Sequence, residues 1–382
     1  MTEQLVKPPR FLPQLIRTLG KDAFFVTLLA VLAVLTVMAP GQIVNYPWLV
    51  DWPTIAALTG LLMLTKGVES SGALHRMGRW AIALVNTERS AALCLVLAAA
   101  LLSTLLTNDV ALFVVVPLTL GVCRIARLPA TRLIVFEALA VNAGSALTPI
   151  GNPQNLFLWQ LSKSSFAYFV GHMLTLVAVL MVLLLALTVC AFSAKPMHVS
   201  REENEQPLDR ALLSVSLALY VPFLVLTDLH GAPWALAAVT LILFAVRRCV
   251  LARIDWGLLL VFILMFIDLR LLAGQSLVHE WMDRLDLTQP QHLFLTGIGA
   301  SQIISNVPAA IALAEYSRDW RVIAYGVNIG GFGFMVGSLA NLIALRMAGD
   351  RKAWLSFHAY SLPFLLVSGI AGYGLLYWQH LG

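Results

Sequence analysis

Charged residues are scarce in this sequence: they make up 12% of its 382 residues, whereas 59% are hydrophobic. A soluble domain carries about 25% charged residues, because its surface faces water. Long stretches have no charge at all, since residues 23–40 and 166–194 contain no Asp, Glu, Lys or Arg. About 18 such residues are enough for a helix to span a bilayer. The scarcity of charge therefore excludes a soluble domain and predicts a helical membrane protein.

Cysteine is also rare, and the features of an enzyme are missing. The four cysteines lie in or beside apolar runs without the spacing of a metal site, so we interpret them as small buried hydrophobes. The eight histidines are scattered, without clustered acidic partners, and the sequence has no glycine-rich nucleotide-binding loop. These absences argue against an enzyme and against ATP as the direct energy source.

The first apolar run follows a basic stretch that contains Lys7, Arg10, Arg17 and Lys21. A signal peptide has a shorter apolar core, of about 7–15 residues, followed by a cleavage site with small residues. We therefore expect the run to be retained as the first membrane helix.

Thirteen apolar segments follow one another along the chain. Nine are long enough to cross a membrane: 22–40, 51–74, 131–160, 166–193, 211–229, 232–250, 255–275, 321–348 and 355–378. Four are short and form two adjacent pairs: 90–106 with 110–123, and 291–304 with 308–316. Each pair flanks a polar tip, Thr107-Asn108-Asp109 or Ser305-Asn306-Val307. Polar backbone is tolerated at membrane depth where it is buried in protein, so the pairs predict re-entrant hairpins over 90–123 and 291–316.

The distribution of basic residues tests this topology. With the N-terminus in the cytoplasm and both hairpins returning to the side they left, 19 of the 25 Lys and Arg residues fall on the cytoplasmic side. Four fall outside, at Lys163, Arg284, Arg318 and Arg321. This asymmetry obeys the positive-inside rule. Because the basic residues form scattered rims and not one patch, the excess positive charge does not indicate nucleic-acid binding.

The two halves of the chain resemble each other. Asp51-Trp52 recurs as Asp255-Trp256, and the Thr107-Asn108 tip recurs as Ser305-Asn306. A longer stretch repeats at one constant offset of 186 residues, which pairs Asn142 with Asn328, Gly144 with Gly330, Gly151 with Gly337, Asn155 with Asn341 and Leu156 with Leu342. Five crossings precede the second copy, so the two copies have opposite orientations in the membrane. Inverted repeats with broken helices are typical of secondary transporters.

The fold class that follows is an all-α polytopic membrane protein, an inverted repeat with two re-entrant hairpins and two broken transmembrane helices. Its predicted parts are a cytoplasmic N-terminal segment 1–21, a first repeat 22–193 with hairpin 90–123, a cytoplasmic linker 194–210, an extra linking helix 211–231 and a second repeat 232–382 with hairpin 291–316.

Four polar breaks, namely the two tips and the stretches Asn142–Asn155 and Asn328–Asn341, interrupt these segments. Gly and Pro unwind a helix and free its carbonyls and amides. Freed carbonyls with Asn, Ser and Thr oxygens suit a cation such as Na⁺, whereas the N-terminal ends of half-helices suit an anion. The predicted binding residues are Thr107, Asn108, Asp109, Asn142, Thr148, Gly151, Asn152, Asn155, Ser305, Asn306, Asn328, Gly337, Ser338 and Asn341.

Asp109 is the carboxylate at a hairpin tip, and its counterpart in the second repeat is Val307. Burial disfavours the charged form of a carboxylate, so Asp109 is a candidate proton carrier or cation ligand. The alternative is a helix cap at the start of the half-helix that begins at Val110.

Lys66 and Arg270 are the basic residues within spanning segments, and the offset of 204 residues that pairs the Asp-Trp motifs also pairs them. Charges inside a membrane are costly and usually functional, so they are candidate counter-charges for an anion. The alternative is a local ion pair, Lys66 with Glu69 and Arg270 with Asp268, or a side chain that reaches toward the interface. We interpret the remaining acids at membrane edges, Glu137 and Asp228, as structural or solvated.

The run from Gly144 to Asn155 (GSALTPIGNPQN) resembles the broken-helix signature of divalent-anion/sodium symporters. Thr107-Asn108-Asp109 and the run Gly337–Asn341 (GSLAN) are more similar to the arsenite-efflux and citrate-transporter-like (CitMHS-type) branches. All these belong to the ion transporter superfamily, and the resemblance covers nearly the whole chain.

The resemblance implies two hairpins whose tips face the broken helices. By position it implies one Na⁺ site at Thr107, Asn108 and Asn155 in the loop from Gly151, and a second at Ser305, Asn306 and Asn341 in the loop from Gly337. The symporters have Ser-Asn-Thr at both tips, whereas the third residues here are Asp109 and Val307. This departure argues against dicarboxylate recognition and two-sodium coupling, and an acid at one tip favours proton coupling.

We therefore expect a multi-pass protein of the bacterial inner membrane with a cytoplasmic N-terminus. Its predicted function is secondary active transport of a small inorganic or organic anion by alternating access, coupled to a H⁺ or Na⁺ gradient, without another cofactor. The alternatives are a sodium/proton antiporter of the same fold and, in a different class, a passive ion channel. The expected partners are the anion and the lipid bilayer, with a homodimer left open.

Overall fold

A computed structural model of the chain describes residues 19–20, 23–74, 76, 86–126, 130–196, 208–350 and 352–381. Most of the predicted N-terminal segment 1–21 and of the linker 194–210 lies outside these residues, as do 77–85 and 127–129 in two predicted cytoplasmic loops. In the described part every regular element is a helix, apart from a bridge between Thr87 and Pro196.

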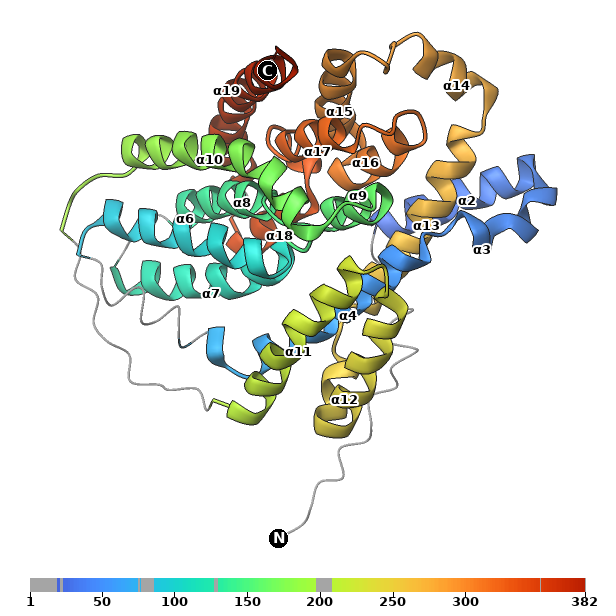
Figure 1. The fold of residues 1–382 in the computed structure, drawn as a ribbon. Helices are drawn as coiled ribbons and strands as arrows, with labels where there is room; N and C mark the ends of the chain where they lie inside the picture. The colour runs from blue at the N-terminus through green and yellow to red at the C-terminus, as the bar shows by residue number, and fades with distance from the viewer. Residues whose placement is uncertain are drawn as a thin grey trace.

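Within the described residues, the first half of the fold (Figure 1) runs through ten helical elements, including one 3-10 helix, η1. These are α2 (Ala23–Met38), η1 (Pro40–Asn45), α3 (Tyr46–Leu49), α4 (Trp52–Ser70), α6 (Glu88–Leu105), α7 (Asn108–Ala126), α8 (Ala130–Ser145), α9 (Pro153–Ser162), α10 (Phe166–Ala191) and α11 (Arg210–Asp228).

The second half continues with nine more. These are α12 (Ala232–Ala252), α13 (Trp256–Ala273), α14 (Ser276–Asp283), α15 (Pro290–Ile304), α16 (Asn306–Ala314), α17 (Trp320–Ile329), the 3-10 helix η2 (Met335–Gly337), α18 (Leu339–Ala348) and α19 (Ala353–Leu381). Six described helices are long and apolar enough to cross a membrane, or seven if the bent pair Pro40–Leu49 and Trp52–Ser70 counts as one span.

The predicted fold class is confirmed, and the repeat holds down to single hydrogen bonds. Asp51 and Asp255 cap α4 and α13, where each side chain accepts from the backbone N–H three residues on. The indole N–H of the next residue, Trp52 or Trp256, donates to the backbone carbonyl five residues before it. The two motifs therefore start equivalent helices in the same way.

The repeats are interlocked, because each packs its helices on the other. The first helix of each repeat contacts the second helix of the other, so that α2 lies on α13 and α12 lies on α4. The hairpins do the same with the broken helices, since α7 contacts α18 and α16 contacts α9. This exchange brings both hairpin tips and both breaks into one region.

The helices divide into two groups (Figure 1). One group contains α2–α4 and α11–α14, and the other contains α6–α10 and α15–α19. The main helix contacts between the groups are those of α4 with α7 and α9, and of α13 with α16. The second group contains the hairpins and the broken helices. The first group therefore borders on the candidate site mainly through α4 and α13, and this border is narrow.

Contacts among helix ends agree with the predicted sidedness. On the predicted cytoplasmic side, Glu88 at the start of α6 pairs with Arg132 of α8 and accepts from Ser193 after α10. Thr131 donates to Asp350 across the repeats. The N–H of Lys352 and this hydroxyl hold the pKa of the Asp350 carboxyl below its usual value. Hence α6, α8 and α10 meet at one face, as a re-entrant hairpin requires.

On the predicted outer side a second set of ends meets. Asp228 at the end of α11 accepts from the backbone N–H of Phe166 at the start of α10. Arg270 near the end of α13 pairs with Glu315, which follows α16. His172 of α10 stacks edge-on against Trp320 at the start of α17.

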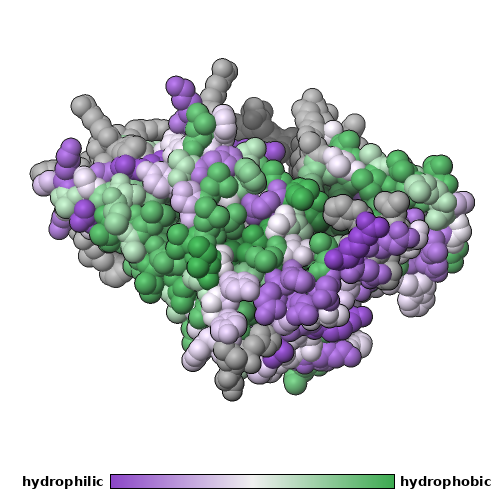
Figure 2. Space-filling model, turned by 90° about the horizontal axis from the view of Figure 1, so that it is seen from above, coloured by the Kyte–Doolittle hydropathy of each residue, from purple (hydrophilic) through white to green (hydrophobic). Residues whose placement is uncertain are grey.

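Hydrophobic residues cover much of the surface seen in Figure 2, and hydrophilic residues gather there in separate patches. Large apolar side chains such as Val37, Trp234 and Ile370 are more than two-thirds exposed. Such a surface is stable in a lipid environment, where apolar side chains meet apolar chains.

Two features of the fold differ from the expectation. The chain forms η1 and α3 before α4, and α14 before the second hairpin, none of which the apolar segments indicate. The limbs of the first hairpin, with 18 and 19 residues, are also longer than those of the second, with 15 and 9. Polar residues such as Glu88 and Asn108 end the apolar runs but continue the helices, so hydropathy underestimates helix length.

Candidate functional site

Two broken helices contribute unwound backbone to the site. The first is unwound between Ser145 and Pro153, and the second between Ile329 and Leu339. Proline supplies no N–H to a helix; Pro149 lies in the first break, and Pro153 begins the half-helix that follows it, α9. The second break has four glycines, of which Gly333 has a φ of +93° that other residues rarely adopt.

Two amide–amide hydrogen bonds join the breaks. The Nδ2 of Asn142 donates to the Oδ1 of Asn341 at 2.7 Å, and the Nδ2 of Asn328 donates to the Oδ1 of Asn155 at 2.7 Å. Asn142 and Asn328 occupy equivalent positions, as do Asn155 and Asn341. The pair of bonds is therefore symmetric, and each bond crosses from one repeat to the other. We call these four residues the asparagine square.

The square also fixes the unwound backbone. The Nδ2 of Asn155 lies 3.1–3.4 Å from the carbonyls of Ser145, Ala146 and Thr148, and the Nδ2 of Asn341 donates to the carbonyl of Gly331 at 2.9 Å. Both ends of these two amides are engaged with protein. In this conformation the side chains of Asn155 and Asn341 therefore support the loops from inside, and their roles as Na⁺ ligands stay predictions.

Asn152, in the first break, makes a further hydrogen bond from the first repeat to the second. Its Oδ1 accepts from the N–H of Asn155 and caps α9, while its Nδ2 donates to Ser145 and to the Oδ1 of Asn328. Its counterpart Ser338 is buried at the start of α18 but makes no cap bond. The two halves of the site are thus equivalent in backbone and unequal in side chains.

The first hairpin tip is bonded to the first break. The N–H of Asn108 donates to the carbonyl of Gly151 at 2.9 Å. The hydroxyl of Thr104 donates to the carbonyl of Gly144 at 3.0 Å, and Thr148 donates to the carbonyl of Thr104 at 2.7 Å. This arrangement brings Thr107, Asn108 and Asp109 next to the predicted loop residues.

The second tip is held differently. Gln302 donates to the carbonyls of Gly330 and Phe332 and accepts from the N–H of Phe334. Ser305 turns the chain at a φ of +74°. A Cβ at Gly331 would lie 3.2 Å from the Nδ2 of Asn306 and 3.5 Å from the Oδ1 of Asn142. Asn306 therefore faces the loop after α17, and Ser305 lies beside it.

Sequence reasoning missed Thr104 and Gln302. Both bond the carbonyl of an equivalent glycine, Gly144 or Gly330, and the offset of the hairpin tips pairs them. Their signal was the pair of polar residues, Ser103-Thr104 and Ser301-Gln302, one turn before each tip. These residues position the breaks against the hairpins.

Four half-helices begin at this centre. The N-terminal ends of α7, α9, α16 and α18 lie at the two tips and the two breaks, and each directs its positive dipole end inward. The C-terminal ends of α6, α8, α15 and α17 reach the same centre with their carbonyl groups. The arrangement can bind an anion and a cation next to each other.

Three buried oxygens at the centre have no hydrogen-bond partner among the described residues: Thr107 Oγ1, Asp109 Oδ1 and Gln154 Oε1. All three belong to the first repeat. No backbone N–H of α7 is bonded to the Asp109 carboxylate in the described structure, so the alternative of a helix cap is not supported. An unpartnered carboxylate with neighbouring hydroxyl and amide oxygens has the chemistry to take up a proton or a cation such as Na⁺.

Lys66 and Arg270 are both paired. Lys66 bonds Glu69 at 2.9 Å, which is the local pair considered from the sequence. Arg270 pairs at 2.9 Å with Glu315 and donates to the carbonyl of Leu49. The alternative pair of Arg270 with Asp268 is therefore wrong, because the guanidinium reaches across to the end of the second hairpin.

The interpretation of Asp228 as structural agrees with its bond to Phe166. Glu137 is fully buried, not solvated, and accepts from the hydroxyl of Thr119. Its second oxygen has no partner among the described residues.

Comparisons with known proteins show the family of this chain. The sequence profile of the citrate transporter family, CitMHS, matches residues 15–321. The chain belongs to the citrate transporter family. The inner membrane protein YbiR of Escherichia coli is 46% identical over 361 residues, which cover 94% of this chain and 97% of YbiR. An uncharacterized transporter of Methanocaldococcus jannaschii is 30% identical over 362 residues, or 94% of each chain.

Among solved structures, the YdaH transporter of Alcanivorax borkumensis matches with a TM-score of 0.52 at 13% identity, over 87% of this chain and 86% of that one. The likeness supports the fold alone. Family membership confirms the predicted resemblance, and this member of the citrate transporter family is a membrane transporter and not an enzyme. The match to YbiR confirms the predicted inner-membrane location.

Proposed function

We propose that this protein is a secondary active transporter of a small anion, coupled to a proton or sodium gradient through alternating access. The observation that carries the proposal is the convergence of four half-helix N-terminal ends, two from each repeat, on one buried polar centre. The positive dipole ends of these half-helices favour negative charge on the substrate. A soluble anion cannot cross the bilayer unaided, so a site buried between two inverted repeats must open to each side in turn.

In this proposal the coupling ion binds to residues of the first repeat. Thr107, Asp109 and Gln154 have unpartnered buried oxygens, whereas the second tip has none among the described residues. Asp109 has no basic side chain bonded to it in the described structure, so a proton or a cation is needed to neutralise it. The narrow border between the two helix groups supports movement of one group past the other.

The test is uptake into proteoliposomes that contain the purified protein. A panel of inorganic and organic anions, including citrate, is offered while a pH gradient and a Na⁺ gradient are applied separately. We expect one class of anion to accumulate above equilibrium with one of the two gradients. Uptake that never exceeds equilibrium under either gradient contradicts active transport and favours a passive channel.

A sodium/proton antiporter is the second candidate, and Asp109 is the observation that favours it. An antiporter needs one site that protons and Na⁺ occupy in turn, which a buried carboxylate can provide. The same vesicles discriminate the two functions. When a pH gradient is applied and no transportable anion is present, an antiporter exchanges Na⁺ for protons. An anion transporter moves its coupling ion only together with its substrate.

A further inference from the structure

A second unpartnered carboxylate lies outside the site described above. Asp268 of α13 is 1% exposed, and the residues of the same turn, Met265, Phe266 and Ile267, are buried with it. Both carboxylate oxygens of Asp268 are buried and have no hydrogen-bond partner among the described residues. No function assigned so far uses this side chain.

The basic groups on α4 and on α13 itself are engaged with acids other than Asp268. The elements that pack on α13 are α2, α3, α4, α14 and α16, and α9, which has no titratable residue, contacts it through the ring pair of Phe157 and Phe266. Of these, α2 and α16 have no titratable residue, and Tyr46 of α3 shares a hydrogen bond with Thr36. On α4, Lys66 pairs with Glu69, and on α13 itself Arg270 pairs with Glu315. The following helix α14 carries His279, Glu280 and Asp283.

The physical state of Asp268 follows from these contacts. An ionised carboxylate without hydrogen bonds or a paired cation is costly to bury, and far more costly than a neutral carboxylic acid. A metal cation needs several oxygen ligands, and no polar atom of the described residues is bonded to this carboxylate. A proton is therefore the ligand that this environment fits.

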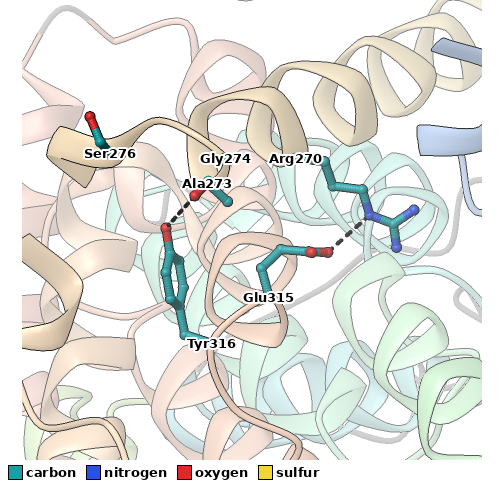
Figure 3. A pocket seen from close by; sticks show the side chains of 6 residues that line it. All are labelled: Arg270, Ala273, Gly274, Ser276, Glu315 and Tyr316. Carbon is teal, nitrogen blue, oxygen red and sulfur yellow. Dashed lines mark hydrogen bonds and ion pairs between the residues drawn. The ribbon is translucent and has the colours of Figure 1, made fainter. Parts of the chain in front are cut away.

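An open pocket of about 460 Å³ lies at the end of the same helix (Figure 3). It is lined by Arg270, Ala273, Gly274, Ser276, Glu315 and Tyr316. The Arg270–Glu315 ion pair crosses it from α13 to the end of the second hairpin, and Tyr316 donates to the carbonyl of Ala273. Arg270 follows Asp268 by two residues, so it lies about 3 Å further along the helix axis and on another face of the helix. The pocket therefore marks the outer end of the helix that carries Asp268.

The first repeat has no acid at this position. The offset that pairs Asp51 with Asp255 places Leu64 of α4 opposite Asp268, and Leu64 is fully buried. A leucine is thus compatible with the packing of the equivalent helix. The fold does not require an acid here, and its presence needs another explanation.

We propose that Asp268 is a second proton-binding site of this transporter. Its part in coupling rests on the proposed transport function, whereas binding of the proton does not. Because α13 contacts α16 of the second hairpin, protonation of Asp268 removes a buried charge from a helix at which the two helix groups meet.

Carbodiimide labelling tests proton binding without any transport. Carbodiimides react with protonated carboxylic acids, and the adduct is located by mass spectrometry of the purified full-length protein. We expect an adduct on Asp268 at about pH 5 that is lost as the pH rises to about 9. The Asp268→Asn variant should lose this adduct alone. An Asp268 that is never labelled, or that is labelled equally at all pH values, overturns the proposal.

Coupling is tested in proteoliposomes with Asp268→Asn and Asp268→Leu, of which the second copies Leu64 and controls for packing. Both variants should exchange substrate across the membrane but lose accumulation driven by a pH gradient. Undiminished accumulation in a variant that has lost the adduct overturns the coupling role. If the wild-type protein transports no anion, the proposed function fails while the labelling result still decides whether Asp268 binds a proton.

Discussion

At the scale of single residues, Asn328 bonds both repeats through one amide. Its Nδ2 donates to Asn155 and to the carbonyl of Ala324, and its Oδ1 accepts from Asn152. Asn142 occupies the equivalent position but has a single short bond, to Asn341, besides a 3.5 Å contact with Gly331. The two residues therefore offer a matched comparison within one chain.

We predict that Asn328→Ala destabilises the protein more than Asn142→Ala. Each buried polar group left without a partner costs about 1–3 kcal/mol, and the first substitution leaves more of them. Both variants should also lose transport, because the breaks lose their connection. Thermal unfolding followed by tryptophan fluorescence measures the order. Equal stability of the two variants would show that the additional bonds of Asn328, to Ala324 and Asn152, do not contribute.

The carboxylate of Asp109 gives a second prediction at this scale. Asparagine keeps the shape and an oxygen ligand, but it cannot carry a proton. We expect Asp109→Asn to bind and exchange substrate while it no longer accumulates substrate in response to a pH gradient, with residual exchange nearly independent of pH. Counterflow and pH-driven uptake are measured side by side on the same vesicles. Undiminished pH-driven accumulation in the variant excludes Asp109 as the proton carrier.

At the scale of helices, the close approach of α6 and α8 depends on glycine. A Cβ at Gly144 would lie 2.2 Å from the carbonyl oxygen of Ala100, a distance that backbone cannot accommodate without a shift. Gly144 also presents its carbonyl to Thr104. A shift of α6 therefore moves the hairpin tip away from the break.

Gly144→Ala should consequently reduce transport strongly and destabilise the protein by about 1–3 kcal/mol, as overpacking does elsewhere. Gly171→Ala on α10 is the matched control, because its Cβ would meet nothing within 4 Å. Alanine there is neutral or stabilising by about 0.5–1 kcal/mol, since it restricts the unfolded chain. Initial uptake rates and thermal unfolding are compared for both variants. Equal effects would contradict a packing role for Gly144.

The hairpin tips yield a prediction of paired losses. Asn108 and Asn306 are both buried and occupy equivalent places at the two tips. We expect Asn108→Ala and Asn306→Ala each to abolish transport while expression and thermal unfolding stay close to those of the unmodified protein. Normal transport by either variant would mean that the centre is misplaced.

Much of this arrangement was predictable from the sequence, for identifiable reasons. Helix breaks and hairpin tips are marked by Gly, Pro and Asn within apolar runs, and the repeat marks them twice. Gln302 and Asp268 were not recognised, because their roles depend on contacts, or on missing contacts, with residues far along the chain. The true partner of Arg270 is likewise 45 residues away, and no local pattern indicates it.

At the scale of the whole molecule, the contacts between helix ends separate two faces. Glu88, Arg132 and Ser193 meet at one face, and Arg270 and Glu315 meet at the other. The scarcity of basic residues in the loops on the outer side of the membrane agrees with this separation. Both limbs of the first hairpin should therefore be reached from the cytoplasm.

Cysteine labelling checks this topology after the four native cysteines are replaced. Asn86→Cys and Ala130→Cys, on either side of the first hairpin, should both react with a membrane-impermeant thiol reagent from the cytoplasmic side. Arg318→Cys, after the second hairpin, should react from the outer side. Labelling of Asn86→Cys and Ala130→Cys from opposite sides would falsify the first hairpin.

The exchange of helices between the repeats also constrains how the protein is made. One face of α2 packs against α13, which is synthesised more than 200 residues later. At about 5–20 residues per second, the ribosome needs on the order of 10–40 s to supply that partner. During this interval the newly inserted first half has no complement for α2 or α4, and lipid or insertion factors must shield the polar breaks. Neither half is a folding unit, so two separately expressed halves should assemble only when they meet in the same membrane.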